Sequence, residues 1–232
     1  MKLVTFQHAG RVHYGAVKNG KVIDLSVRMG AQYPDLVSFI AHQGQEVAAN
    51  IVAQNSGDYD YEHLDLLPVV HNPAKILCVG LNYHDHVTEA NNAVGNRKVP
   101  DRAMIFARWP ESLTAHQKPI LRPRVSHMLD WEAELLVVIG KPTGRYLSKD
   151  KVFDHIFGYS CFNEACIRDY QRHSSQINPG KNFEKTGSSG PWLVTADEIP
   201  DPMNLNIEMR SEEHTSELQS HLNLVCRLLL EK

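Results

Sequence analysis

Two glutamates separated by one residue open an apolar segment in the middle of the chain. Glu132 and Glu134 stand at the head of the run WEAELLVVIG, residues 131–140. On a β-strand, residues i and i+2 point to the same side, about 6.5–7 Å apart. Two such carboxylates resist burial unless a cation compensates them, and oxygen ligands favour Mg²⁺, Mn²⁺ or Ca²⁺ over zinc. The spacing therefore indicates a divalent-metal site, with a solvated strand edge as the alternative.

Glu164 is a candidate third ligand, because it directly follows the apolar segment IFGYSCFN, residues 156–163. Arg168 and Gln171 come next and are three residues apart, so on a helix they share one face. The planar guanidinium of an arginine there could bind a carboxylate. The alternative is a surface ion pair between Glu164 and Arg168 at a spacing of four.

Two further segments carry residues with possible chemistry. His86 and Glu89 are three apart in NYHDHVTEA, residues 82–90, and could act as a base and the residue that orients it, or be a plain helix-surface pair. Lys181 lies in a Gly-rich stretch that lacks the order GxxxxGK[ST] of a phosphate-binding loop. Its spacing leaves two readings open, an exposed loop lysine or a cation directed into a pocket.

The segments that must position these residues are mostly strand-like. Short alternating runs before residue 70 include Asn19-Gly20, a hairpin signal because both residues accept positive φ, and a helix is expected over residues 35–50. From residue 74 on, runs rich in Val, Ile and Leu bounded by Gly and Pro predict buried strands with few long helices. The predicted fold class is α+β, mostly β, with a small α+β N-terminal domain at 1–70 and a catalytic domain at 74–209.

Composition narrows the possible partners and location. The chain has 24 Lys and Arg against 27 Asp and Glu, a net charge of −3, which argues against binding to nucleic acid or an anionic membrane. There is no run of about 18 apolar residues and no signal-peptide pattern, so we expect a cytoplasmic protein. The four cysteines lack CxxC spacing and are expected to be free thiols.

Residues 210–232 differ from the rest of the chain. They interrupt an alternating strand that begins near residue 206, and RSEEHTSELQS matches the translation of a common sequencing-library adapter. We therefore expect this tail to be non-native and the catalytic domain to be C-terminally incomplete. The alternative is a short amphipathic helix with an apolar face made of Leu218, Leu222, Val225 and Leu229.

Five segments in a fixed order resemble the fumarylacetoacetate hydrolase family, in its shorter bacterial form. They are GLNYHDHVTEA, IFARWPESL, LDWEAELLVVIGK, GYSCFNEACIRDYQ and GKNFEKTGSSGPWLVTADEIPDP. The resemblance covers residues 1–209 and implies a catalytic domain of the mixed β-sandwich or β-roll type. Two positions depart from the family pattern: Glu164 stands where many relatives carry Asp, and Arg108 stands where a lysine is expected.

The resemblance also implies roles for individual residues. The implied ligands of Mg²⁺ or Mn²⁺ are Glu132, Glu134 and Glu164. The implied catalytic residues, which activate water and stabilise developing negative charge, are His86, Glu89 and Lys181. The implied substrate-binding residues are Tyr83, Arg168 and Gln171.

The implied activity is metal-dependent hydrolysis of C–C bonds in acylpyruvate-like or fumarylacetoacetate-like acids, by way of an enolate. The same centre serves isomerases and decarboxylases of hydroxymuconate-type intermediates in aromatic catabolism, and lyases of the ureidoglycolate type, so these remain alternatives. A third alternative is a truncated, inactive fragment that only binds metal. The implied partners are a small keto-acid substrate and, for the full-length protein, a second copy in a homodimer.

Overall fold

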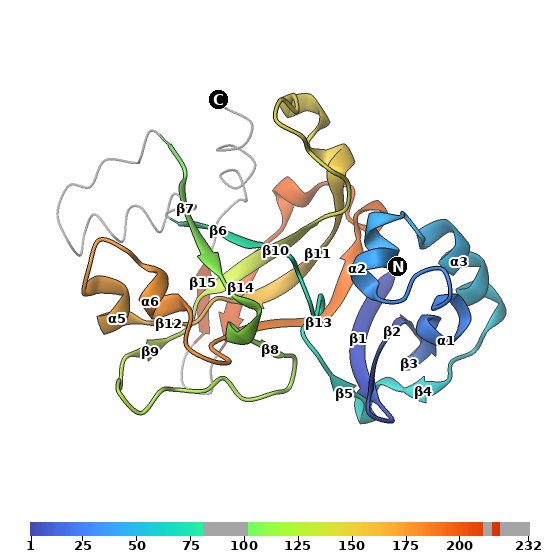
Figure 1. The fold of residues 1–232 in the computed structure, drawn as a ribbon, viewed down its shortest axis with the longest axis horizontal. Helices are drawn as coiled ribbons and strands as arrows, with labels where there is room; N and C mark the ends of the chain where they lie inside the picture. The colour runs from blue at the N-terminus through green and yellow to red at the C-terminus, as the bar shows by residue number, and fades with distance from the viewer. Residues whose placement is uncertain (81–101, 211–214, 219–232) are drawn as a thin grey trace.

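The computed structural model describes residues 1–80, 102–210 and 215–218 (Figure 1). Tyr83, His86, Glu89, Leu222, Val225 and Leu229, all named above, lie outside the described residues, and so does the fourth cysteine, Cys226. The strands are β1 Lys2–His8, β2 Arg11–Lys18, β3 Lys21–Asp24, β4 Tyr59–Asp60, β5 Asp65–Leu66, β6 Ile76–Gly80, β7 Met104–Arg108, β8 Leu113–Ala115, β9 Leu129–Asp130, β10 Ala133–Ile139, β11 Ile156–Asn163, β12 Cys166–Ile167, β13 Gly187–Thr195, β14 Ile207–Arg210 and β15 Thr215–Leu218. The helices are α1 Leu25–Met29, α2 Leu36–Ala41, α3 Gln45–Gln54, α5 Arg168–Arg172 and α6 Asn178–Lys181.

One large sheet runs through the described part of the chain in the order β10-β11-β13-β1-β2-β3-β4, with β5 on β1 and β8 on β13. Its neighbours are antiparallel except for the parallel pair β13–β8. Helices α1–α3 lie beside the N-terminal strands at one end of the molecule, and α5 and α6 lie at the other (Figure 1). The α+β, mostly β class is confirmed.

The hairpin at Asn19-Gly20 is confirmed. Lys18 of β2 pairs with Lys21 of β3, and the two residues between them have φ values of 52° and 74°. Both dihedrals fall in the left-handed region that a two-residue turn of type I′ needs.

The helix expected over residues 35–50 is two helices, α2 and α3. Gln43, between them, has a φ of 54° and donates from Nε2 to the carbonyls of Ile40 and Gly140 at 2.9 and 3.0 Å. At Gly44 a Cβ atom would lie 2.6 Å from the Phe39 ring. The single-helix prediction is wrong because this break depends on contacts with residues outside the segment.

The sheet crosses the expected domain boundary near residue 70. Leu3 of β1 pairs with Leu193 of β13. One hydrophobic cluster contains Leu3, Tyr14 and Phe39 from the N-terminal part together with Phe157 and Leu193, all of them buried. The two expected domains therefore share a sheet and a core, and their division at residues 70–74 stays a prediction.

The last described strand, β15, pairs antiparallel with β14. It lies within the expected tail, whose non-native origin stays a prediction, and residues 219–232 are outside the described part. Among the described residues, no helix has the length and apolar character to span a membrane. Three described cysteines, Cys78, Cys161 and Cys166, are free thiols, as expected.

Candidate metal centre

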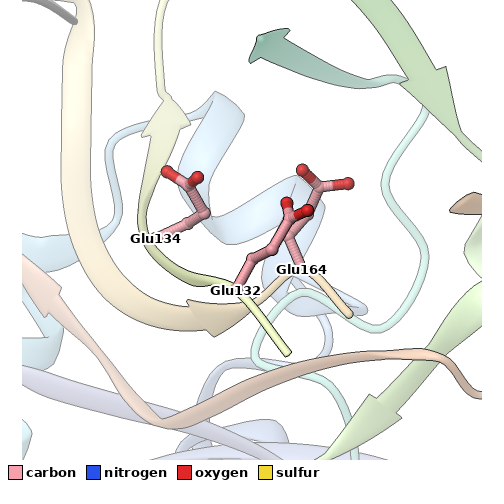
Figure 2. A group of neighbouring side chains, drawn as sticks. All are labelled: Glu132, Glu134 and Glu164. Atoms are coloured by element: carbon pink, nitrogen blue, oxygen red, sulfur yellow. The ribbon is translucent and has the colours of Figure 1, made fainter. Parts of the chain in front are cut away.

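The structure brings Glu132, Glu134 and Glu164 together. One carboxylate oxygen from each lies within 4.8 Å of the others, and the three carboxylates point to the same side (Figure 2). Glu164 is buried, and the other two are partly buried. Such a set of oxygen donors fits a hard divalent cation such as Mg²⁺ or Mn²⁺. Their role as ligands stays a prediction.

The register of two antiparallel strands produces this convergence. Glu134 of β10 is opposite Phe162 of β11, and the backbone N–H of Glu164, just past the end of β11, donates to the Glu132 carbonyl at 2.8 Å. The Asn163 side chain accepts from the Glu132 N–H at 3.2 Å. The pairing continues past the strand ends, so two segments about thirty residues apart present their carboxylates together.

Lys181, at the end of α6, is a buried member of this cluster and only 1% exposed. Its Nζ atom lies 2.6 Å from Glu132 Oε2 and 3.2 Å from Glu164 Oε2. The open question from the sequence is therefore answered, because this lysine is a cation directed inward. Burial lowers the pKa of Lys181, but the charges of Glu132 and Glu164 outweigh burial, and the net shift is upward.

Arg168, at the start of α5, also contacts the cluster, with a side chain 19% exposed. Its Nη1 atom lies 2.5 Å from Glu132 Oε1, and its Nε atom lies 2.7 Å from Asp130 Oδ2. Nη1 also donates to the Gln171 side chain at 3.2 Å, so these two residues share a helix face as expected. β12 lies between Glu164 and Arg168, which places them on no common helix and disfavours the surface-pair alternative.

Two residues of the cluster had no role assigned from the sequence. Asp130 fixes the Arg168 guanidinium, and Arg108 of β7 donates from Nε to Glu164 Oε1 at 3.0 Å. In the sequence, Arg108 stands where the family pattern has a lysine. The position therefore keeps its positive charge, and this was the signal that could have found it. For Asp130 the only signal was its place two residues before Glu132.

The pKa of Glu164, the most buried carboxyl group of the cluster, is raised above its ordinary value, because burial outweighs the neighbouring cations. Burial raises the pKa of Glu164, while the nearby charges of Lys181 and Arg108 act in the opposite direction. Buried carboxylates are tolerated where cations and hydrogen bonds compensate them. A second source of positive charge, such as a bound dication, would favour the ionised form further.

Comparison with known proteins identifies the family. A family model described as "Fumarylacetoacetate (FAA) hydrolase C-terminal" matches residues 75–227, more than half of the chain. The chain belongs to the fumarylacetoacetate hydrolase family. The resemblance stated from the five sequence segments is thereby confirmed.

One relative of this chain carries the name of an enzyme. The oxaloacetate tautomerase fahd2 of Xenopus laevis, described as mitochondrial, is 33% identical over 219 residues, which cover 90% of this chain. The match spans 66% of that protein's length, slightly under two thirds.

Two solved structures share the fold. Fumarylacetoacetate hydrolase from Exiguobacterium antarcticum aligns with a TM-score of 0.72 and 28% identity, covering 100% of this chain and 80% of that one. Maleylpyruvate hydrolase from Sphingobium sp. SYK-6, in complex with manganese(II) and pyruvate, aligns with a TM-score of 0.77 and 23% identity, covering 99% and 81%. At 23% identity, the likeness to the maleylpyruvate hydrolase shows the fold alone.

Proposed function

We propose that this chain is a divalent-metal enzyme that converts a small 2-oxo acid by way of its enolate. The observation that carries the proposal is the convergence of Glu132, Glu134 and Glu164 within 4.8 Å. These three side chains would hold Mg²⁺ or Mn²⁺. The manganese and pyruvate named in the maleylpyruvate hydrolase structure support both the metal and the class of ligand.

The neighbouring cations suit an anionic substrate. When bound, the divalent cation supplies Lewis acidity that polarises a carbonyl group and offsets developing negative charge. Lys181 holds its ammonium group at the same carboxylates and can donate a hydrogen bond to an oxyanion formed beside them. Arg168, held through Nε and Nη1 by Asp130, Glu132 and Gln171, is the guanidinium that we propose binds a substrate carboxylate.

The first candidate reaction is hydrolysis of a C–C bond in an acylpyruvate-like or fumarylacetoacetate-like acid. In this proposal His86, oriented by Glu89, removes a proton from water as the water oxygen attacks the carbonyl beside the bond that breaks. The electron pair of that bond leaves as an enolate, which is protonated to the smaller keto acid. The second product is a carboxylic acid.

The second candidate is keto–enol tautomerisation, which the naming of the Xenopus relative as an oxaloacetate tautomerase favours. This reaction moves one proton between the enol oxygen and the neighbouring carbon, and it needs no attack by water. The described cations of the cluster, Lys181 and Arg168, suit the negative charge of an enolate, whereas the hydrolysis proposed above also uses His86 and Glu89. Isomerisation and decarboxylation share the same enolate and belong with this candidate.

The test is a panel of assays with Mg²⁺ or Mn²⁺ on the full chain and the variant Glu134→Gln. Pyruvate release from acylpyruvates reports hydrolysis, and decay of the enol absorbance of oxaloacetate reports tautomerisation. Glu134→Gln leaves the ion pairs of Glu132 with Arg168 and Lys181 in place. Glu46→Gln, an exposed glutamate in α3, is the matched control.

We expect turnover that requires metal and falls roughly 100-fold or more in Glu134→Gln, since Lewis acidity contributes several kcal/mol to such reactions. Glu46→Gln should match the wild type. Metal-independent turnover, or an unchanged Glu134→Gln, would contradict the proposal. Metal binding with no turnover of any substrate in the panel would favour the non-catalytic fragment.

A further inference from the structure

Arg108 is the most enclosed charged residue around the carboxylates, with a side chain 0% exposed. Its three nitrogen atoms all donate. Nε binds Glu164 Oε1 at 3.0 Å, Nη2 binds the Ala165 carbonyl at 2.5 Å, and Nη1 lies 3.2 and 3.4 Å from the hydroxyls of Ser112 and Thr186. The guanidinium is therefore held in one orientation.

The groups around Arg108 match the planar shape of its guanidinium. The Ser112 and Thr186 hydroxyls donate to the carbonyls of Trp109 and Phe183, each at 2.8 Å, which leaves their lone pairs to accept from Arg108. At Gly187 a Cβ atom would lie 2.6 Å from Arg108 Nη1. The space for the guanidinium is thus bounded by the two hydroxyls, by the Ala165 carbonyl and by Gly187, which has no side chain.

This arrangement has a direct effect on Glu164. Arg108 occupies Oε1, and Lys181 lies 3.2 Å from Oε2, so the plane of the carboxylate is set by a cation at each oxygen. Oε2 is left on the side of Lys181, whose ammonium group also contacts Glu132. A Glu164 carboxylate turned by about a right angle about its own axis would lose both of these contacts.

We propose that Arg108 is a positioning residue of the metal centre, which orients the Glu164 carboxylate so that Oε2 faces Glu132 and Glu134. The inference rests on the proposed metal-binding function and deepens it. Partners that orient a ligand in this way typically contribute 10–100-fold to metal affinity. A merely structural arginine would stabilise the fold without changing the affinity for metal.

The experiment measures Mn²⁺ binding by the full chain from the electron paramagnetic resonance signal of free Mn²⁺, which disappears on binding. The variants are Arg108→Met, which keeps an apolar stem without the charge, and Arg108→Lys, which keeps the charge without the fork. The matched control is Arg28→Lys, which alters the ion pair between Arg28 and Asp58 in the N-terminal part. Circular dichroism and urea unfolding report the fold of each variant.

We expect the Kd for Mn²⁺ to rise about 10–100-fold in Arg108→Met and about 3–10-fold in Arg108→Lys, and to stay unchanged in Arg28→Lys. An unchanged Kd in folded Arg108→Met, or a Kd in Arg108→Lys equal to that in Arg108→Met, would overturn the inference. If Arg108→Met does not fold, an unchanged Kd in Arg108→Lys overturns it. Absence of Mn²⁺ binding by the wild-type chain would overturn the proposed function as well, which separates the two failures.

Discussion

At the scale of single residues, the cluster balances opposite charges within a largely buried volume. Its members are the carboxylates of Glu132, Glu134 and Glu164 and the cations of Arg108, Arg168 and Lys181. An isolated buried charge is very costly, whereas paired and hydrogen-bonded charges are tolerated. The pairing explains why a lysine with 1% exposure retains its charge, and why a carboxylate donor set can exist in the interior.

A second ion pair, far from this cluster in sequence, allows a prediction about pH. The hydrogen bonds from Arg28, at 2.6 and 2.9 Å, hold the pKa of Asp58 below its ordinary value of 3.8. The folded-state pKa is the lower one, so the ionised pair stabilises the fold above pH 3.8. This contribution declines as pH falls through the folded-state pKa.

Asp58→Asn should therefore lower the free energy of unfolding by about 0.5–1 kcal/mol at pH 7, a value appropriate to a solvent-screened pair. Because protonation of Asp58 competes with the ion pair once the pH falls below 3.8, the difference between the two proteins should be smaller at pH 3. Urea unfolding at both pH values measures it. A difference that is as large at pH 3 as at pH 7 would show that the charge of Asp58 is not responsible.

At the scale of elements, the candidate centre is assembled from strand ends and short helices. β10 and the segment before it contribute Glu132 and Glu134, the end of β11 leads to Glu164, and α6 contributes Lys181. β7 contributes Arg108 from the far side of Glu164. β13 packs against Arg108, and Arg108 binds Glu164. A small displacement of β13 should therefore move Arg108 and, with it, the Glu164 carboxylate.

Gly187→Ala in β13 tests this transmission. A Cβ atom there would lie 2.6 Å from Arg108 Nη1 and 2.9 Å from the Phe162 ring, so the guanidinium must shift. We expect a loss of about 1–3 kcal/mol in the free energy of unfolding, typical of an overpacked interior, together with weaker Mn²⁺ binding. Urea unfolding and Mn²⁺ titration measure the two effects.

Gly20→Ala is the matched control for this substitution. A Cβ atom at Gly20 meets nothing within 4 Å, but the φ of 74° disfavours alanine by about 1–2 kcal/mol. The turn variant should therefore lose stability while binding Mn²⁺ normally. Equal Mn²⁺ affinities in both glycine variants would show that strain at β13 does not reach the carboxylates.

At the scale of the whole molecule, one sheet connects the N-terminal strands with the strands that lead to the carboxylates. β1 lies between β13 and β2, and Leu193 of β13 is completely buried in the shared core. A chain starting after residue 70 would expose the edge of β13 and the apolar residues beneath β1. Exposed edges of this kind promote aggregation.

We therefore expect deletion of residues 1–70 to yield aggregated protein, or protein without a cooperative thermal transition. Size-exclusion chromatography and circular dichroism, with the full chain prepared in the same way, make the measurement. A monodisperse product that unfolds cooperatively would instead show that residues 74–209 are an independent domain, as the sequence suggested. Homodimerisation and a cytoplasmic location stay predictions.

Local patterns in the sequence determined several features by themselves. The Asn19-Gly20 turn follows from the φ values those residues accept, and the common side of Glu132 and Glu134 follows from the two-residue period of a strand. The family was recognised from five short segments in a fixed order, and each segment can be read without knowledge of the tertiary structure. Such features depend on neighbours within a few residues, so they are readable from the chain alone.

The tertiary structure decided the features that depend on residues distant in sequence. Lys181 meets a carboxylate 49 positions away, and Arg108 meets one 56 positions away. The burial of this lysine, the orientation of Glu164 and the break at Gln43 all arise from such contacts. The charge and size of a side chain limit which residues can be its partners. Only the packing of the sheet and helices determines which of those residues come within hydrogen-bonding distance.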